Sequence, residues 1–582
     1  MRRLGCDTNH LEVSLQKIFR YFSLLGLFYS LASPVVPGEA LAQTASDPAR
    51  VEERLEQRDA AQPHKREKID SLQPSGAQDS PGVADDTRFV LSAVTFTGNT
   101  VFTAADFTEF YEPLLAREIN LEDVRKVASD VTGYYRAKGY FLSRAVVESQ
   151  NLEFGILNIR VIEGRISEVK FEADTADQRD LLRPYGDKIA KTEGPANVNT
   201  VERYLLLMND LPGIDARGKV RRLDDDNGTY ALDVSVVKKP VSAFFNVDNR
   251  GTRAIGRDQA YVSMTANGWL TGRDSTRVGV FTIPSSPKEL AYVELAQQWA
   301  LGAEGTTVGA SVSYSAIDAG ADEKDNDLNS QSERGSLYVS HPIVRGRTEN
   351  LRISGSFDVS RQKQFDFGVF DFEDRLQVLR SGIEGYYEDD LRGANYGTLW
   401  VSRGLGLDDS DRDAPFRSRS GGRPIFTNLY ARAERRQSFL DNWAVKVSVA
   451  GQVADQRLLS NEEFSLGGYL YGRGYDAGEI SGTHGAAGSI ELQYGEDLET
   501  DSWLSSYQFY GFYDGGAVWE TASNSYASGH ESLTSAGVGV RAGLGTAFIG
   551  GLEVAAPLTR PAAEIGGDGK DPRLFMFLSG NF

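Results

Sequence analysis

From Val241 onward, apolar and polar residues alternate in short segments along the chain. A period of two is typical of a β-strand whose two faces meet different surroundings. The segment that starts at Ser506 is the clearest case, with two sets on opposite faces: Gln508, Tyr510, Phe512 and Asp514 on one, and Tyr507, Phe509, Gly511 and Tyr513 on the other. Ser489–Tyr494 alternates in the same way, and so does the end of the chain, although Phe575 and Phe577 blur the polar face there.

About sixteen such segments of roughly 9–13 residues follow Val241, which is the length that a tilted membrane strand needs. A soluble sandwich or propeller would carry polar residues on its outer face, whereas here that face is apolar and aromatic. Long acidic connections such as Asp318–Asn329 and Gly404–Arg423 alternate with short ones such as Asp441-Asn442. We therefore predict a transmembrane β-barrel of about 16 antiparallel strands over residues 240–582, with extracellular loops, periplasmic turns and an aqueous lumen.

Before the barrel, the pattern changes to mixed helices and strands. We expect a strand at Phe89–Thr97, helices at Thr103–Leu115 and Leu121–Lys138, and strands near Ser143–Val147 and Glu153–Val161. The order partly recurs afterwards, with strands at Ile166–Phe171, Lys219–Arg222 and Tyr230–Val237 and a helix at Thr200–Asn209. These patterns predict two small α+β domains, at residues 88–163 and 164–239.

The N-terminal 87 residues contain three different kinds of segment. Basic residues, an apolar run and Ala40-Leu41-Ala42 predict a signal peptide over residues 1–42. Asp47–Asp59 reads as a short helix, with Pro48 at its first position and only Val51 and Leu55 as large apolar residues. A flexible linker completes residues 43–87. The helix is either a mobile plug for the lumen or part of a solvated tail.

Composition narrows the functions that remain open. Among 582 residues the only cysteine is Cys6, so the chain after the predicted signal has no disulfide, thiolate metal site or cysteine nucleophile. A net charge of −20 disfavours nucleic acid as a partner. The serines lack a nucleophile-elbow pattern, and the five histidines show no metal-ligand spacing. We expect no enzyme activity, no cofactor and no metal.

Motifs in both halves of the chain support a family resemblance. Residues 88–163 carry Gly98-Asn99, Gly139-Tyr140, Gln150, Gly155 and Glu163-Gly164, and they resemble polypeptide-transport-associated (POTRA) domains. The match is weaker for residues 164–239. The resemblance implies that both domains lie in the periplasm.

The connection Asn461–Gly485 is rich in glycine and aromatic residues and contains Gly472-Arg473-Gly474-Tyr475. It resembles the sixth extracellular loop of the outer-membrane assembly and translocation superfamily, which folds back into the lumen. A second superfamily motif matches Phe512, Asp514 and Gly516 in Phe512-Tyr513-Asp514-Gly515-Gly516. The resemblance implies that Arg473 pairs with Asp514 inside the barrel; the alternative is a solvated Arg473.

The superfamily usually has an aliphatic residue where this chain has Gly472. We expect this departure to loosen the packing of the loop tip and to leave the ion pair intact. Gly472 and Gly474 allow compact backbone angles at the tip.

Two POTRA-like domains, a barrel and an N-terminal helix resemble the two-partner secretion transporters, the hemolysin secretion/activation family. The resemblance implies a pore in the outer membrane of a Gram-negative bacterium, surrounded by lipid and inserted by the barrel-assembly machinery. It also implies export of an unfolded β-helical exoprotein, an adhesin or cytolysin, captured by a POTRA strand edge at Ser143–Val147 or Lys219–Arg222. An alternative is an insertase of proteins or lipids from the same superfamily. The sequence does not identify the client.

Overall fold

The structure is a computed structural model of the whole chain. It describes residues 50–61, 72, 88–224, 226–252, 255–320, 327–407, 416–498, 503–520, 529–562 and 569–582. The predicted signal peptide with Cys6, the first residues of the predicted N-terminal helix and all of the linker except Leu72 lie outside these residues. Within them, none of the helices is both long and apolar enough to cross a membrane.

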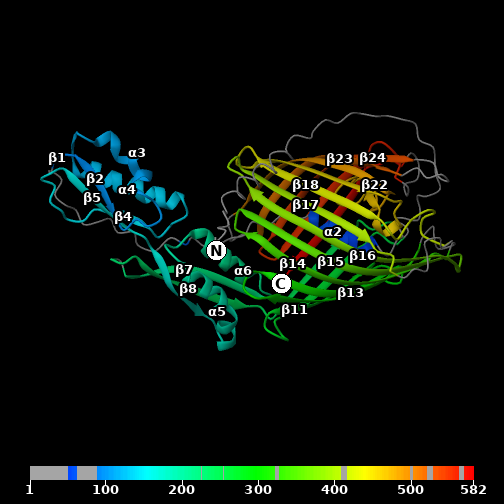
Figure 1. Cartoon of the computed structure of the whole chain (residues 1–582). Helices are drawn as coiled ribbons and strands as arrows, with labels where there is room; N and C mark the ends of the chain where they lie inside the picture. The colour runs from blue at the N-terminus through cyan, green and yellow to red at the C-terminus, as the bar shows by residue number, and fades with distance from the viewer. Residues whose placement is uncertain are drawn as a thin grey trace.

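Sixteen antiparallel strands form one closed barrel, which confirms the predicted fold class (Figure 1). In chain order the strands are β9 (Val241–Asp248), β10 (Gln259–Asn267), β11 (Asp274–Thr282), β12 (Leu290–Leu301), β13 (Thr306–Asp318), β14 (Asn329–Arg345), β15 (Glu349–Asp366), β16 (Val369–Glu388), β17 (Gly393–Gly404), β18 (Thr427–Ser438), β19 (Trp443–Ala454), β22 (His484–Asp497), β23 (Leu504–Trp519), β24 (His530–Leu544), β25 (Phe548–Pro557) and β26 (Arg573–Asn581). The last strand closes the ring by pairing with the first, from Phe577 opposite Asp248 to Asn581 opposite Phe244.

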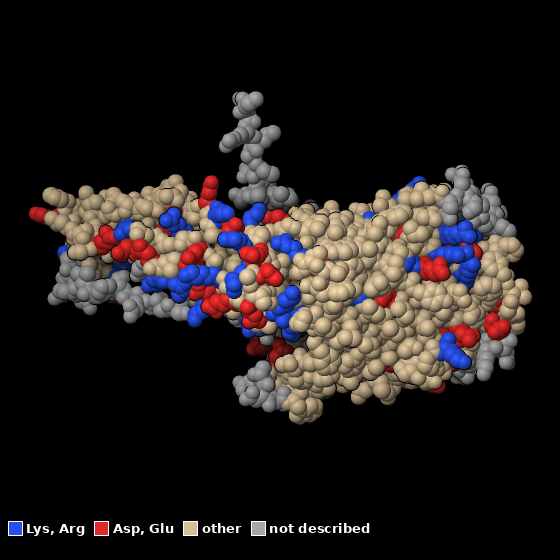
Figure 2. Space-filling view, turned by 90° about the horizontal axis from the view of Figure 1, so that it is seen from below, with Lys and Arg blue, Asp and Glu red and all other residues tan. Residues whose placement is uncertain are grey.

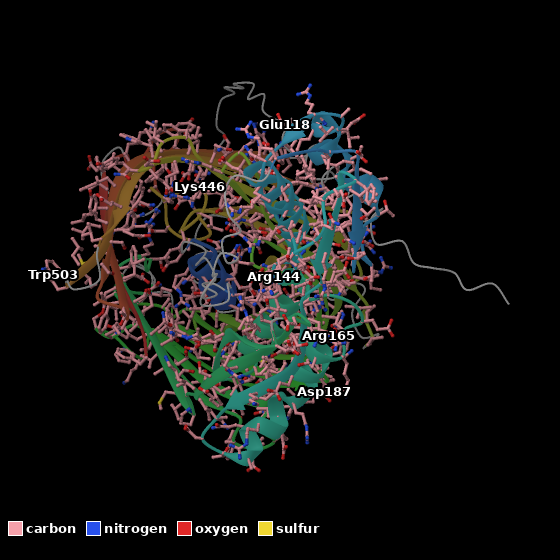
Figure 3. All side chains as sticks on the ribbon, turned by 90° about the vertical axis from the view of Figure 1, so that its left-hand side faces the viewer. Glu118, Arg144, Arg165, Asp187, Lys446 and Trp503 are labelled. Carbon is pink, nitrogen blue, oxygen red and sulfur yellow. The ribbon has the colours of Figure 1, made fainter. Side chains whose placement is uncertain are left out.

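The two faces of the barrel strands follow the predicted alternation. On β23, Phe509 and Tyr513 are about half exposed on the lipid side, whereas Tyr510 and Asp514 are buried on the lumen side. Figure 2 shows the middle of the outer barrel surface as nearly free of charged residues, which gather over the other domains and at the far end of the barrel. Seen from the periplasmic end in Figure 3, Trp503 projects from the outer side of the ring, as expected for an aromatic residue at the membrane boundary.

The first POTRA-like domain contains β1 (Phe89–Val90), β2 (Ala93–Thr97), η2 (Ala104–Phe107), α3 (Thr108–Tyr111), η3 (Glu112–Leu114), β3 (Glu118–Ile119), α4 (Leu121–Ala137), β4 (Arg144–Val146) and β5 (Ile156–Ile162). The predicted strand Phe89–Thr97 is broken in two, and its first part pairs with β3 in a separate small sheet. The predicted helix Thr103–Leu115 consists of three short turns of mixed type. Apolar side chains of α4 pack on the three-stranded sheet β2-β5-β4.

Glu163 ties the first domain together at one end of β5. Its carboxylate accepts bonds from the Tyr135 hydroxyl at 2.8 Å, from the backbone N–H groups of Thr100 and Val101 and from the Thr100 hydroxyl. Burial and the neighbouring Glu163 carboxylate raise the pKa of Tyr135 above its ordinary value. Glu163 therefore has a structural role, because it accepts hydrogen bonds from the loop that follows β2 and so holds this loop in place.

The second POTRA-like domain contains β6 (Arg165–Glu172), α5 (Ala176–Ala190), α6 (Val198–Asn209), β7 (Ile214–Asp224) and β8 (Thr229–Lys238). Its sheet has the order β6-β8-β7. Helix α5 was not predicted, and β7 is much longer than the predicted Lys219–Arg222. Apolar residues of both helices form one core with the sheet, and Leu72 from the linker packs in the same core.

The second domain is fastened to periplasmic turns of the barrel. The Arg345 guanidinium on β14 donates to both carboxylate oxygens of Asp210, at 2.9 and 2.7 Å. Glu304, in the turn between β12 and β13, lies 2.8 Å from Lys188 Nζ and accepts from Tyr204 and Arg203. Burial opposes ionisation of Glu304, but these three partners outweigh it and hold its pKa below the ordinary value.

Candidate functional site

The long connection between β19 and β22 folds inward and packs against the lumen side of the barrel wall. It contains η6 (Ser460–Glu462) and the hairpin of β20 (Phe464–Leu466) with β21 (Ile480–Gly482). Its apolar side chains share a core with residues of the wall: Leu466, Tyr471, Tyr475 and Ile480 from the loop, and Ala450, Ala487, Val518 and Leu533 from the strands. The loop is therefore a packed element of the lumen.

Arg473 lies at the tip of this loop and is 4% exposed. Its Nε atom is 2.7 Å from Asp514 Oδ2 on β23, and its Nη1 atom is 2.7 Å from Glu491 Oε2 on β22. Glu553 on β25 lies 3.6 Å away, and the guanidinium plane is 3.4 Å above the centre of the Phe512 ring. A planar guanidinium is suited to such simultaneous pairing and stacking.

Asp514 holds the loop backbone as well as the arginine. Its Oδ1 atom accepts from the backbone N–H groups of Gly472 and Arg473, at 3.0 and 3.3 Å, and from the Ser535 hydroxyl. The carboxylate is fully buried, so each of these bonds replaces a water contact that it has lost. Removing Asp514 would thus release the loop tip at several atoms at once.

The glycines of the two motifs are needed for different physical reasons. Gly472 has a φ of +81°, and a Cβ there would lie 2.4 Å from a methyl group of Leu533. The expectation that Gly472 loosens the tip is therefore wrong, because Leu533 fills the space that an aliphatic side chain would use. Gly474 and Gly516 allow close backbone approach, since a Cβ would lie 2.8 Å from the Ala556 carbonyl carbon and 2.4 Å from the Ala486 oxygen, respectively.

The residues that follow Arg473 anchor the other side of the tip. Tyr475 is buried, and its hydroxyl donates to the Arg560 carbonyl at 3.1 Å. Asp476 pairs with Arg573 of β26. The structure thus brings together all of the predicted site residues: Gly472, Arg473, Gly474, Tyr475, Phe512, Asp514 and Gly516.

Sequence reasoning missed part of this network. Glu491, Glu553 and Arg250 complete it, with Arg250 donating to Glu553 at 2.5 Å and to the carbonyls of Gly468 and Arg473. Glu491 lies on the polar face of the alternating segment Ser489–Tyr494, and this position was the signal that it points into the lumen. The meeting of β22, β23 and β25 at one arginine depends on strand register, which the alternation alone does not give.

Helix α2 (Val51–Ala61) lies inside the ring of strands (Figures 1 and 3). Val51 is fully buried in an apolar cluster of the wall that includes Tyr292 and Ile317. At the other end of the helix, the Arg58 guanidinium lies 5.3 and 4.9 Å from the ring centres of Phe244 and Tyr261. Contacts with several strands place the helix across the lumen.

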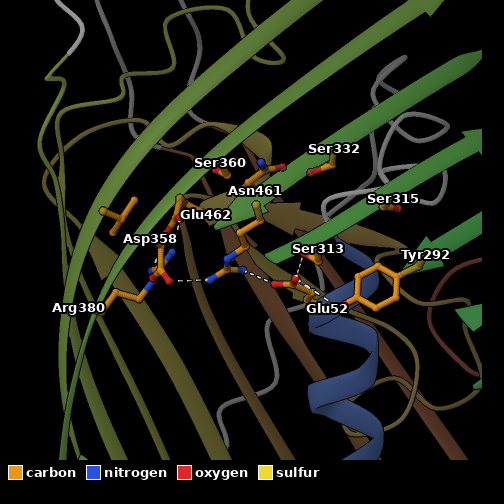
Figure 4. Close-up of a pocket in the computed structure, with 12 residues that line it drawn as sticks. Glu52, Tyr292, Ser313, Ser315, Ser332, Asp358, Ser360, Arg380, Asn461 and Glu462 are labelled. Atoms are coloured by element: carbon orange, nitrogen blue, oxygen red, sulfur yellow. Dashed lines mark hydrogen bonds and ion pairs between the residues drawn. The ribbon is translucent and has the colours of Figure 1, made fainter. Parts of the chain in front are cut away.

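Charged residues of α2, and Arg50 just before it, contact both the wall and the inward-folded loop. Arg50 Nη2 donates to the Ser460 carbonyl at 2.7 Å, and Glu53 accepts from the Ser465 hydroxyl. Glu52 lies 2.7 Å from Arg334 Nη1 on β14. From there an ion-pair chain continues through Asp358 and Arg380 to Glu462 of the loop (Figure 4).

No group of residues with metal-ligand geometry occurs among the described residues. The buried charged side chains of the site pair with each other, with hydroxyl groups and with the backbone. Such a network can hold a loop and a helix in place, and it contains no arrangement that we can assign to a catalytic step.

Comparisons with known proteins agree with this architecture. A family model for the haemolysin secretion/activation protein ShlB/FhaC/HecB matches residues 231–542, and a model for the ShlB-type POTRA domain matches residues 89–164. The outer membrane transporter CdiB of Escherichia coli O6:K15:H31 (strain 536 / UPEC) is 23% identical over 577 residues, covering 94% of this chain and 92% of that protein. The heme/hemopexin transporter protein HuxB of Haemophilus influenzae (strain 86-028NP) is 22% identical over 406 residues, covering 68% of this chain and 70% of that protein.

Solved structures show the same fold. CdiB from Escherichia coli superposes with a TM-score of 0.66 at 20% identity, covering 95% of this chain and 100% of that chain. CdiB from Acinetobacter baumannii gives a TM-score of 0.56 at 17% identity, covering 94% and 100%. The chain belongs to the haemolysin secretion/activation family of ShlB, FhaC and HecB, and it is an outer-membrane transporter of the two-partner secretion type with POTRA domains in the periplasm.

Proposed function

We propose that this transporter exports one large β-helical exoprotein, an adhesin or cytolysin, in an unfolded state through the lumen of its barrel. The observation that carries the proposal is the combination of a closed sixteen-strand barrel with two separate elements inside it. A passive porin has no need for a loop tip held by several buried ion pairs beside a separate charged helix in the same lumen. An exporter needs a passage that stays closed until its client arrives.

The POTRA domains supply free sheet edges for capture of the client by strand addition. Both predicted edges are at the end of a sheet, since β4 and β7 are terminal strands. The Thr132 hydroxyl accepts from the Ala145 backbone N–H on β4, and the Asn209 side chain bonds to Ala216 on β7. The remaining part of β7, including Lys219–Arg222, is the longer edge, and we favour it for the first contact.

Inside the barrel, we assign different roles to the loop and to the helix. The network of Arg473 and Asp514 keeps the loop tip against the wall and so preserves the shape of the passage. Helix α2 acts as a plug that leaves toward the periplasm, where its linker leads to the first POTRA domain. Insertion by the barrel-assembly machinery, with final contact to outer-membrane lipid, is part of the same proposal.

An assembly factor for proteins or lipids is the second candidate. It is less well supported, because the chain before the barrel has room for two POTRA-like domains and its relatives are transporters. Mass spectrometry of surface and medium proteins should distinguish the two functions. Loss of one large protein on deletion of the transporter, restored by the wild-type chain, would support export. Loss of many outer-membrane proteins would support assembly.

A further inference from the structure

The carboxylate of Glu52 occupies a small receptor on the barrel wall (Figure 4). Its Oε1 atom accepts from the Ser313 hydroxyl at 2.5 Å and from the Tyr292 hydroxyl at 3.4 Å. Its Oε2 atom lies 2.7 Å from Nη1 of Arg334. The Tyr292 hydroxyl is equally close to Glu294, at 3.4 Å, so the Ser313 hydroxyl and the Arg334 guanidinium are the main donors to this carboxylate.

The receptor belongs to the wall and not to the helix. Tyr292, Ser313 and Arg334 come from the neighbouring strands β12, β13 and β14, and Ser313 is the direct cross-strand partner of Arg334. Ladder hydrogen bonds of a closed barrel hold these positions whether or not α2 is present. The receptor therefore remains formed when the helix leaves.

The cavity around this receptor is lined by hydroxyl groups, one of which is buried without a partner among the described residues. It continues past Glu52 and is lined by further hydroxyl groups of the wall: Ser315, Ser332 and Ser360. Ser315 is 3% exposed, and its hydroxyl has no hydrogen-bond partner among the residues that the structure describes. Buried hydroxyls almost always have a partner, so this one points to a ligand beside the carboxylate.

The charges around Arg334 also favour an incoming anion. After Glu52, the nearest carboxylate that pairs with Arg334 is Asp358, at 3.6 Å. Asp358 is held more closely by Arg380, at 2.9 Å, and Arg380 also pairs with Glu462. When α2 leaves, Arg334 keeps the longer pair with Asp358, and its guanidinium faces the lumen as a cation that can bind another anion.

We propose that the wall receptor of Tyr292, Ser313 and Arg334 is a carboxylate-binding site for the client. Glu52 fills it at rest, and an aspartate or glutamate side chain of the passing extended chain fills it during export, with the nearby serines bonding to the client backbone. This inference rests on the proposed function, because it requires a polypeptide in the lumen. It implies that the client displaces the plug by exchange, so Arg334 regains a close carboxylate partner.

Single-channel recording in planar bilayers tests the site directly. The full chain with Glu52→Ala vacates the receptor, and hexaglutamate is the probe, with hexaglutamine as the neutral control. Hexaglutamate should block the open channel with dwell times about 10-fold longer than those of hexaglutamine. Adding Arg334→Gln should shorten the hexaglutamate dwell time to that of hexaglutamine.

A matched arginine controls for the general charge of the lumen. Arg436 on β18 bonds to Gln493 and Ser438 and is not part of the receptor. Arg436→Gln in the Glu52→Ala chain should leave the hexaglutamate dwell time unchanged within about 2-fold. Ser313→Ala should shorten it about 3-fold, which separates the receptor from long-range attraction.

The proposal is overturned if the two peptides give equal dwell times, or if Arg334→Gln and Arg436→Gln have the same effect. Such a result would leave the proposed export function standing, provided that cells with the wild-type chain still secrete the client. If instead hexaglutamate blocks the channel as expected but cells with the wild-type chain secrete no client, the carboxylate site is supported and the export function is contradicted.

Discussion

The inward-folded loop and helix α2 occupy the same lumen but are held in opposite ways. Arg473 at the loop tip pairs with carboxylates from three strands, and Asp514 adds bonds to the loop backbone. The helix is held through side chains along its length, such as Val51 in its apolar cluster, Glu52 on the wall and Arg58 against two aromatic rings. In the proposed export cycle, bonds from a buried carboxylate to the loop backbone keep the loop tip in place, whereas the side-chain contacts of the helix are exchanged as it leaves.

Typical interaction energies set the scale for the contacts of the helix and of the loop tip. Full burial of a side chain such as Val51 contributes about 1.5–3 kcal/mol, and an isolated helix of this length is marginal in water. Breaking a buried ion pair by removing one partner costs on the order of 3–5 kcal/mol. In the proposed export cycle, client binding offsets the loss of the helix contacts, including the Glu52–Arg334 pair, while the loop tip stays in place.

The largest effect is expected from the loop tip. Arg473→Ala should abolish export with barrel insertion largely intact, because the penalty falls on the loop and the ladder bonds of the sheet remain. Asp514→Ala should give the same phenotype. Secretion assays and heat-modifiability on gels measure the two properties, with Arg352→Ala as the control, since Arg352 on β15 donates to Ser340 of the neighbouring strand.

The Arg473→Ala, Asp514→Ala double variant tests whether the two residues act as one unit. Its secretion defect should be little worse than that of either single variant, because the first substitution already breaks the pair. Additive defects would show independent roles. Normal secretion by Arg473→Ala would contradict a role of the loop-tip ion pairs in export.

Deletion of residues 43–60 should raise single-channel conductance several-fold in planar bilayers. The physical reason is that α2 lies across the lumen and the ring of strands closes without it. An unchanged conductance would instead mean that the helix does not obstruct the passage and belongs to a mere tail.

A smaller effect is expected from single charges of the helix. Glu52→Gln weakens the contacts with Ser313 and Arg334 and should raise the fraction of open channels about 3–10-fold, the equivalent of roughly 1 kcal/mol. Asp59→Asn removes the same charge from α2, but Asp59 pairs with Arg58 of the helix itself. Equal effects of both substitutions would contradict a specific role for the wall contact.

The smallest effect concerns the joint between the second POTRA domain and the barrel. The lowered pKa of Glu304 means that its contribution to docking is complete at neutral pH, persists to about pH 4.5 and is lost as pH falls further. Limited proteolysis of the joint should therefore accelerate below that pH. Glu304→Gln should make cleavage faster at neutral pH and remove most of this pH dependence.

The barrel could be predicted from sequence because its signal is repeated in every strand. Helix α5 was missed because Pro184 and Gly186 lie in its interior, where both residues normally weaken a helix. The break between β1 and β2 at Leu91-Ser92 has no strong turn signal, and β1 depends on pairing with β3, far along the chain.

The loop site was predictable only in part. Arg473 and Asp514 belong to short motifs, so the family resemblance was enough to pair them. Glu553 and Arg250 lie on or beside strands distant in sequence, and only the register of the closed sheet brings them to the same arginine. The wall receptor for Glu52 was not predicted for the same reason, since Ser313 and Arg334 become neighbours only through the pairing of β13 with β14.

A reversible cross-link tests most directly whether α2 must leave the lumen while the client passes. Glu52→Cys and Ser313→Cys, in a Cys6→Ser background, place one thiol on α2 and one at the wall position that Glu52 now contacts. Because a cysteine is shorter than a glutamate, a cleavable cross-linker that reacts with two thiols joins them. If the helix must leave, cross-linking stops secretion of the client, and cleavage of the linker restores it in the same cells. Secretion that continues at the wild-type rate with the cross-link intact would contradict the account.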